Sequence, residues 1–206
     1  MQVTLLESTP NPQALCEKVA AVCRNSTPTR DYCILKNALG MGHDGISEAA
    51  DFVFLVVDIS RAATHQLVRH RIASYWQQSQ RHVKPEGVDW FHIPYSIRKN
   101  WGVMNKYIKH MNTVGDFYDY LINEGVPMED ARYVLPNATH STIALKMNAR
   151  TLDEFFRKRC CNRAQEEIRD LAEDMLLICR GVAPELFKGP YPDCANCKEP
   201  CENSSV

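Results

Sequence analysis

Apolar residues recur along this chain with two different periods, which predict helices in some segments and strands in others. A spacing of three or four residues is typical of amphipathic helices, and it is sustained longest over 101–122. Ser60 can cap a helix at its start, and Thr151 with Glu154 forms a capping box that begins another. The predicted helices are 11–23, 31–39, 60–69, 101–122, a segment that begins at 151, and 164–178.

Shorter segments predict a sheet. The run from Ala50 to Val57 is rich in β-branched and aromatic residues and is bounded by acids, so we expect a buried strand there. Residues 2–6 and 138–147 predict two more strands, whereas the polar residues 72–84 predict a loop or extended chain. Together the elements predict a mixed α/β (α+β) fold, a helix-rich single domain with a small central sheet.

Length and charge narrow the class of protein. A chain of 206 residues accommodates one domain, predicted over 1–190, with a cysteine-containing tail over 191–206. The 24 Lys and Arg nearly balance the 25 Asp and Glu, and a net charge of −1 argues against a general nucleic-acid coat. The longest apolar run, Phe52 to Val57, is far shorter than the ~20 residues that a membrane span needs. Nine cysteines, and an N-terminus without a secretory signal, predict reduced thiols in a cytoplasmic protein.

Three cysteines lie in the tail, at Cys194, Cys197 and Cys201. A CxxC pair with a third cysteine resembles part of a metal site, but structural zinc takes four ligands and no histidine follows. We therefore expect no metal, and a flexible tail or a redox-sensitive thiol pair instead.

A basic segment stands out in the middle of the chain. No acidic residue occurs between Asp58 and Glu86, although five cations do: Arg61, Arg69, Arg71, Arg81 and Lys84. Guanidinium groups bind phosphate bidentately, so the segment suits a nucleotide, while a solvated basic face is the alternative. If the segment is extended, Gln77, Ser79 and Arg81 point to one side, where they could contact a nucleotide's imide edge and phosphate.

Arg159 breaks an otherwise apolar stripe. The helix that begins at 151 has Leu152, Phe155 and Phe156 on one face, and position 159 continues that face. Buried arginines are rare unless paired. The side chain therefore either points a cation into a pocket beside the core, or extends to solvent or to carbonyls at the helix C-terminus.

These residues together resemble a known family. Arg69-His70-Arg71, seven further residues, Ser79 and then Arg81 form a pattern similar to the signature of flavin-dependent thymidylate synthases. The likeness extends over roughly residues 30–180, in consistent order. It includes Gly42-His43 with Glu48, Arg132, Asn148 with Arg150, and Arg159.

The resemblance implies roles for particular residues. Arg159 is the implied catalytic residue, placed at the uracil ring, where it favours ionisation at N3. The implied FAD contacts are Arg69, His70, Arg71, Gln77, Asn148, Ala149, Arg150 and Glu154. The implied dUMP contacts are Gln66, Arg69, Gln77, Ser79, Gln80, Arg81, Arg132 and Arg159, and His43 is expected to contact folate.

The resemblance also implies the reaction. Such enzymes methylate dUMP to dTMP without a cysteine nucleophile. Methylenetetrahydrofolate supplies the carbon, reduced FAD supplies hydride, and NADPH reduces the flavin. They are homotetramers with active sites shared between subunits, and they require neither a nucleic acid nor a membrane as partner.

Several positions depart from the family pattern. Trp76 replaces a common asparagine, Gln77 a common glutamate, Ala49 a histidine and Gly45 a serine or threonine. A divergent member with the same reaction is the favoured interpretation. The alternatives are a related flavin and folate enzyme for another pyrimidine nucleotide, or a non-enzymatic nucleotide- or RNA-binding protein.

Overall fold

Four antiparallel strands form the centre of the computed structural model, which describes residues 1–85, 87 and 89–194. They are β1 (Gln2–Ser8), β2 (Asp51–Ser60), β3 (Ser74–Gln77) and β4 (His140–Asn148). The order across the sheet is β1-β2-β4-β3, so β4 lies between two strands that precede it in sequence. The predicted fold class is confirmed, and the strand at Ser74–Gln77 adds to those expected.

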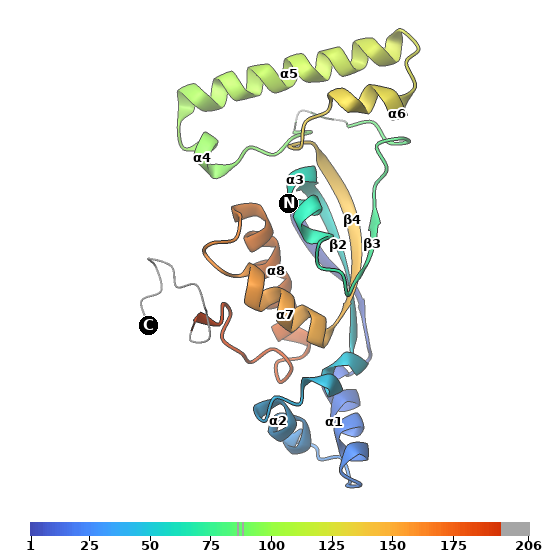
Figure 1. Ribbon diagram of the computed structural model, residues 1–206, viewed down its shortest axis with the longest axis vertical. Helices are drawn as coiled ribbons and strands as arrows, with labels where there is room; N and C mark the ends of the chain where they lie inside the picture. Colours follow the sequence, from blue (N-terminus) through green and yellow to red (C-terminus); the bar gives the residue numbers. More distant parts are fainter. Residues whose placement is uncertain (86, 88, 195–206) are drawn as a thin grey trace.

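Helices lie on one side of the sheet and at its two ends (Figure 1). The α-helices are α1 (Pro12–Cys23), α2 (Cys33–Gly40), α3 (Arg61–Leu67), α4 (Tyr95–Arg98), α5 (Trp101–Asn123), α6 (Met128–Ala131), α7 (Ala149–Arg159) and α8 (Glu166–Val182). Two short 3₁₀ helices are η1 (Asp44–Ala49) and η2 (Arg132–Val134). All six predicted helices occur, with ends that shift by a few residues.

Two helix starts test the predicted caps. The Ser60 prediction is confirmed, because the Ser60 Oγ accepts from the backbone N–H of Ala63 at 3.0 Å. The prediction of a capping box at Thr151 and Glu154 is wrong, since α7 begins two residues before Thr151 and Thr151 is buried inside the helix. Asn148 is the cap, and its side chain accepts from the Thr151 N–H at 2.9 Å. Asparagine is as good a cap as serine, and β4 delivers it to the helix start.

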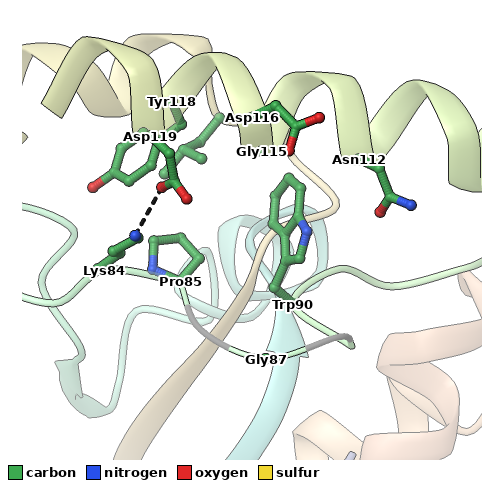
Figure 2. A pocket seen from close by; sticks show the side chains of 10 residues that line it. Lys84, Pro85, Gly87, Trp90, Asn112, Gly115, Asp116, Tyr118 and Asp119 are labelled. Atoms are coloured by element: carbon green, nitrogen blue, oxygen red, sulfur yellow. Dashed lines mark ion pairs between the residues drawn. The ribbon is translucent and has the colours of Figure 1, made fainter. Parts of the chain in front are cut away.

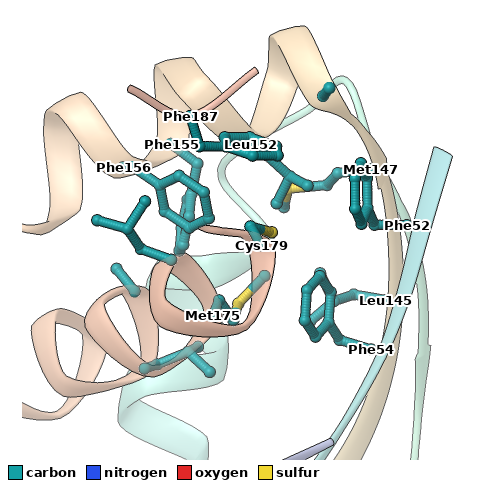
Figure 3. Close-up of a cluster of buried hydrophobic side chains, with 14 of the residues drawn as sticks. Phe52, Phe54, Leu145, Met147, Leu152, Phe155, Phe156, Met175, Cys179 and Phe187 are labelled. Carbon is teal, nitrogen blue, oxygen red and sulfur yellow. The ribbon is translucent and has the colours of Figure 1, made fainter. Parts of the chain in front are cut away.

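The core lies between the sheet and the pair α7 and α8 (Figure 3). Alternate residues of β2 and β4 face this side, which gives a strict alternation of buried and half-buried positions along β4 and along β2 as far as Val57, before the bulge near its end. Phe187, from the segment after α8, packs edge-on against Phe52 with ring centroids 5.6 Å apart. The fully buried side chains include Phe52, Phe54, Ile143, Leu145, Phe155, Phe156 and Met175.

The opposite face of the sheet is open. Figure 1 shows α7 and α8 on one side of the strands and no described helix on the other. Leu6 on β1 and Trp76 on β3 are 53% and 58% exposed. Large apolar side chains on an uncovered sheet face are typical of a surface that a partner covers.

Candidate active site

The basic segment folds into a short strand followed by a turn. β3 pairs with β4, and the Gln78 N–H continues the pairing by donating to the Thr142 carbonyl at 2.8 Å. The chain then turns, because the N–H groups of His82 and Val83 both donate to the Ser79 carbonyl. The prediction that Gln77, Ser79 and Arg81 share one side of an extended segment is therefore wrong. Beyond Thr142 this edge of β4 is occupied by residues 90–92 instead, since the His140 N–H donates to the Trp90 carbonyl at 2.9 Å, and the segment bends at Ser79.

Gln77 faces α3 beneath the turn. Its Nε2 donates to the Thr64 Oγ1 at 2.9 Å and lies 3.3 Å from the Ser141 Oγ, so the amide has a fixed orientation. Gln77 and Gln80 line a hollow of about 340 Å³ between α3 and the chain before β4. The other lining residues are Arg61, Thr64, His65, Val68, Leu135, Pro136 and Asn137.

Guanidinium groups from three segments gather near this hollow. Arg81 pairs with the Glu129 carboxylate at 2.7 Å, and the Nε of Arg132 donates to the Glu129 carbonyl at 3.0 Å. α6 therefore brings together two residues expected at the nucleotide. The Arg81 and Glu129 side chains are each about half exposed, at 54% and 49%, so an anionic ligand could replace this ion pair.

Arg61 is a site residue that the motif did not identify. Its Nη2 donates to the Gln78 carbonyl at 2.7 Å, while its Nε is buried without a hydrogen-bond partner among the described residues. Burial lowers the pKa of Arg61, and the positive charge of Arg132 lowers it further. An anion in the hollow would raise the pKa of Arg61 again, because a nearby negative charge stabilises the protonated guanidinium. The signal in the sequence was the basic segment itself, whose first cation is Arg61.

Arg69, His70 and Arg71 follow α3 on a loop. The Tyr75 hydroxyl donates toward the carbonyls of Leu67 and His70, at 2.9 and 2.8 Å, and fixes the start of this loop. The Arg69 and Arg71 side chains are exposed and form no hydrogen bond or ion pair with the described residues. Two such guanidinium groups, two residues apart, suit a pyrophosphate.

Arg159 lies near the same loop, at the end of α7. It is half-buried, and its side chain makes no hydrogen bond or ion pair in the part of the chain that the structure describes. The alternative in which it binds helix carbonyls is thus excluded.

Burial raises the pKa of Tyr75 to about 12, and the charge of Arg159 opposes this rise. Burial also lowers the pKa of His70, which Lys158 and Arg159 lower further. Arg159 is therefore a cation without a counter-charge, close to Tyr75 and His70.

The start of α7 forms a separate part of the site. Arg150 pairs with the Glu48 carboxylate at 2.5 Å, an interaction that raises the pKa of Arg150. Ala149 and Arg150 line a second hollow, of about 380 Å³, together with Lys36 and Leu39 of α2. His43 is exposed just before η1, near the same end of the molecule.

The remaining expected contacts belong to neither hollow. Gln66 donates from its Nε2 to the Gln165 Oε1 at 3.4 Å, and Glu154 pairs with Lys158 at 3.9 Å. The site residues of one chain are thus divided between its two ends.

Another hollow, of about 530 Å³, contains none of the contact residues expected from the sequence. It lies between α5 and a wall that includes Lys84, Pro85 and Trp90, and Lys84 pairs with Asp119 there at 2.8 Å (Figure 2). The Trp90 indole lies against Gly115 so closely that an added Cβ would come within 3.3 Å of it. Trp90 therefore fixes α5 to the end of the sheet.

The described residues contain neither a cluster of metal ligands nor a membrane-spanning helix. Within 1–85, 87 and 89–194, no three His, Cys, Asp or Glu side chains come together as a possible metal site. In the same residues, no helix is long and apolar enough to cross a membrane. Cys197 and Cys201 lie outside the described residues, so the predicted behaviour of the tail stays a prediction.

Guanidinium groups that are unpaired among the described residues, oriented amides and a hollow beside an antiparallel sheet are typical of proteins that bind small anionic ligands such as nucleotides. The model of the family described as thymidylate synthase complementing protein matches residues 4–185. The flavin-dependent thymidylate synthase of Geobacter sulfurreducens is 43% identical over 206 residues, covering 94% of this chain and 88% of that protein. The enzyme of that name from Clostridium tetani is 40% identical, covering 95% and 89%. The one from Pyrococcus furiosus is 48% identical over 145 residues, covering 69% and 59%.

The chain belongs to this enzyme family, and the resemblance drawn from the Arg-His-Arg motif is confirmed. A flavin cofactor follows from the family, and the described residues fit one. Arg69 and Arg71 are exposed and unpaired among the described residues, which suits the pyrophosphate of a flavin dinucleotide.

Proposed function

We propose that this chain methylates dUMP to dTMP, with methylenetetrahydrofolate as carbon donor and reduced FAD as hydride donor. Residues 1–190 form the proposed catalytic domain, and NADPH is the proposed reductant of the flavin. The observation that carries the proposal is Arg159, a half-buried cation without a partner among the described residues, beside the Arg-His-Arg loop. Family membership supports the same conclusion.

The nucleotide's phosphate is proposed to lie near the hollow beside α3. There it would meet the cations of Arg61, Arg81 and Arg132 and the turn at Ser79 and Gln80, with the Arg81–Glu129 pair opening to admit it. Gln66 and Gln77 carry amides that can both donate to and accept from a uracil edge. These two residues would orient the ring.

Arg159 would act on the uracil ring as an electrostatic clamp. Uracil C5 is a poor nucleophile until electron density moves into the ring, and a fixed cation at N3 and O4 stabilises the anionic form. Arginine stays protonated at physiological pH, so it does not act as a general base. Bound reduced flavin supplies the hydride for the final reduction.

The flavin is proposed to be held by two groups of residues. Arg69, His70 and Arg71 on the loop after α3 would bind its phosphates. Asn148, Ala149, Arg150 and Glu154 would contact it from the start of α7, with Gln77 nearby. His43 would contact the folate.

A homotetramer with shared active sites completes the proposal. The site residues of one chain are divided between separate hollows, and the open sheet face exposes Leu6 and Trp76. Both features fit a site that is assembled from several subunits. Trp76 and Gln77 are neighbours on a strand and so face opposite sides of the sheet. The departure at Trp76 therefore lies on the open face, whereas Gln77 faces α3.

The test is an anaerobic reaction of the purified chain with FAD, NADPH, methylenetetrahydrofolate and dUMP, followed by mass measurement of the nucleotide. A product with the mass of dTMP is expected. Unchanged dUMP with bound, reducible flavin would refute dUMP as the substrate. A protein that binds no flavin would support a simple nucleotide binder instead.

A further inference from the structure

The first residues of α8 contact α3 at both of its ends. At the end of α3, Gln66 donates to the Gln165 side chain at 3.4 Å. At its start, the Glu167 carboxylate accepts from the Ser60 N–H at 2.6 Å and from the Ser60 Oγ at 2.5 Å. Residues 60 and 167 are 107 positions apart in sequence, so this contact joins two distant parts of the chain.

Glu167 is a buried acid outside the residues assigned to the reaction. It is 2% exposed, and Ser60 is 1% exposed. A buried carboxylate is costly unless it is hydrogen-bonded, and here both oxygens accept from the same residue. The Nδ1 of His92 lies 3.8 Å from one carboxylate oxygen and adds a partner when it is protonated.

The geometry gives Glu167 a specific effect on the cap of α3. Because the Ser60 hydroxyl proton points to Glu167, the oxygen's lone pairs are left to accept from the Ala63 N–H, at 3.0 Å. The carboxylate thereby sets the hydroxyl orientation that caps the helix. α3 has only seven residues, too few to be stable alone, so contacts of this kind determine where it lies.

The position of α3 determines that of several proposed ligand contacts. Gln66 is in its last turn, and the chain runs directly from its end into Arg69, His70 and Arg71. We infer that Glu167 is a positioning residue, which acts through Ser60 to hold α3, and with it the nucleotide and flavin contacts, in place. The identity of these ligands rests on the proposed function, whereas the action of Glu167 on α3 does not.

The experiment compares full-length wild type with Glu167→Gln, which keeps the side-chain shape but removes one acceptor. Hydrogen exchange of residues 61–71, followed by mass spectrometry without ligand, measures the local order of α3. Calorimetry measures the dissociation constant for dUMP in the presence of FAD, and flavin absorbance measures FAD binding. We expect faster exchange in 61–71 and a roughly tenfold weaker affinity for dUMP, the effect of losing one buried hydrogen bond to a charged group.

Two controls separate positioning from general stability. Glu173→Gln makes the same change at an exposed position of α8 and is expected to alter none of the measurements. Ser60→Ala removes the hydroxyl contact but keeps the backbone N–H contact, so adding Glu167→Gln to it should change the dUMP affinity less than Glu167→Gln does alone.

The outcomes are distinct. Unchanged exchange in 61–71 would overturn the action on α3, whether or not the protein binds dUMP. Faster exchange with unchanged affinities for dUMP and FAD would overturn the link to the ligand sites. Wild type that binds neither dUMP nor FAD would refute the proposed function, while hydrogen exchange would still decide the action on α3.

Discussion

Replacing Arg159 by alanine tests the proposed electrostatic clamp most directly. The guanidinium is half-buried and makes no hydrogen bond or ion pair with the described residues, so its removal leaves no acceptor without a partner there. The free energy of unfolding should therefore change by no more than about 0.5 kcal/mol. Turnover should fall by roughly 100- to 1,000-fold, because loss of a preorganised catalytic donor raises the barrier by ~3–4 kcal/mol.

The assay is anaerobic single-turnover formation of dTMP, with the melting temperature measured on the same samples. Lys158→Ala removes a neighbouring, exposed positive charge from the same helix and should leave the rate within about twofold of wild type. An independent readout is the imidazole pKa of His70 by NMR. Because Arg159 contributes to lowering that pKa, the substitution should raise it.

Near-normal turnover in a folded Arg159→Ala protein would refute the clamp. An equal loss of rate in Lys158→Ala would show that the general positive charge at the end of α7 matters, and not the Arg159 side chain. A melted variant would refute the expectation that Arg159 contributes little to folding.

Three further predictions concern stability and reactivity. Asn148→Ala should lower the free energy of unfolding by ~1 kcal/mol in chemical denaturation, because the cap of α7 is lost, and no change would contradict that cap. Burial raises the pKa of Tyr75 from 10.0 to about 12, so this tyrosine stabilises the fold below pH 10 and that contribution is lost as the pH rises toward 12. Tyr75→Phe should flatten the fall of stability over this interval in alkaline unfolding curves, and an unaltered curve would argue against the shift. Burial raises the pKa of the Cys160 thiol to about 11, so an alkylating reagent at pH 8 should label exposed Cys33 well before Cys160. Peptide mass mapping measures the order, and equal rates would contradict it.

The sequence predicted the elements whose stability depends on regular burial. The Trp101–Asn123 helix followed from periodicity and the strand that contains Phe52 and Phe54 from its β-branched and aromatic composition, because one face of each packs against another element. The Arg-His-Arg motif predicted the family for a different reason. Its two arginines are exposed and make no contribution to the core, so their spacing is not a matter of packing periodicity.

Features that depend on distant pairing were not predictable. The turn at Ser79 occurs where the chain stops pairing with β4, and β4 lies more than 60 residues later in the sequence. Asn148 caps α7 because β4 continues directly into the helix, whereas the Thr151 and Glu154 pattern was equally plausible locally. The sequence also could not predict that the Nε of Arg61 is buried without a hydrogen-bond partner among the described residues, because this depends on how α3 packs near Arg132.

The contact between Ser60 and Glu167 has a consequence for synthesis on the ribosome. N-terminal segments emerge first, but the helix that leads to the Arg-His-Arg loop is held by a residue near the start of the last helix. The sheet also depends on a segment that is synthesised late, because β4, which lies between β2 and β3, is the last of the four strands to be made. A nascent chain that lacks α8 therefore has its ligand-binding segments but cannot fix their arrangement, so binding competence arises late in translation.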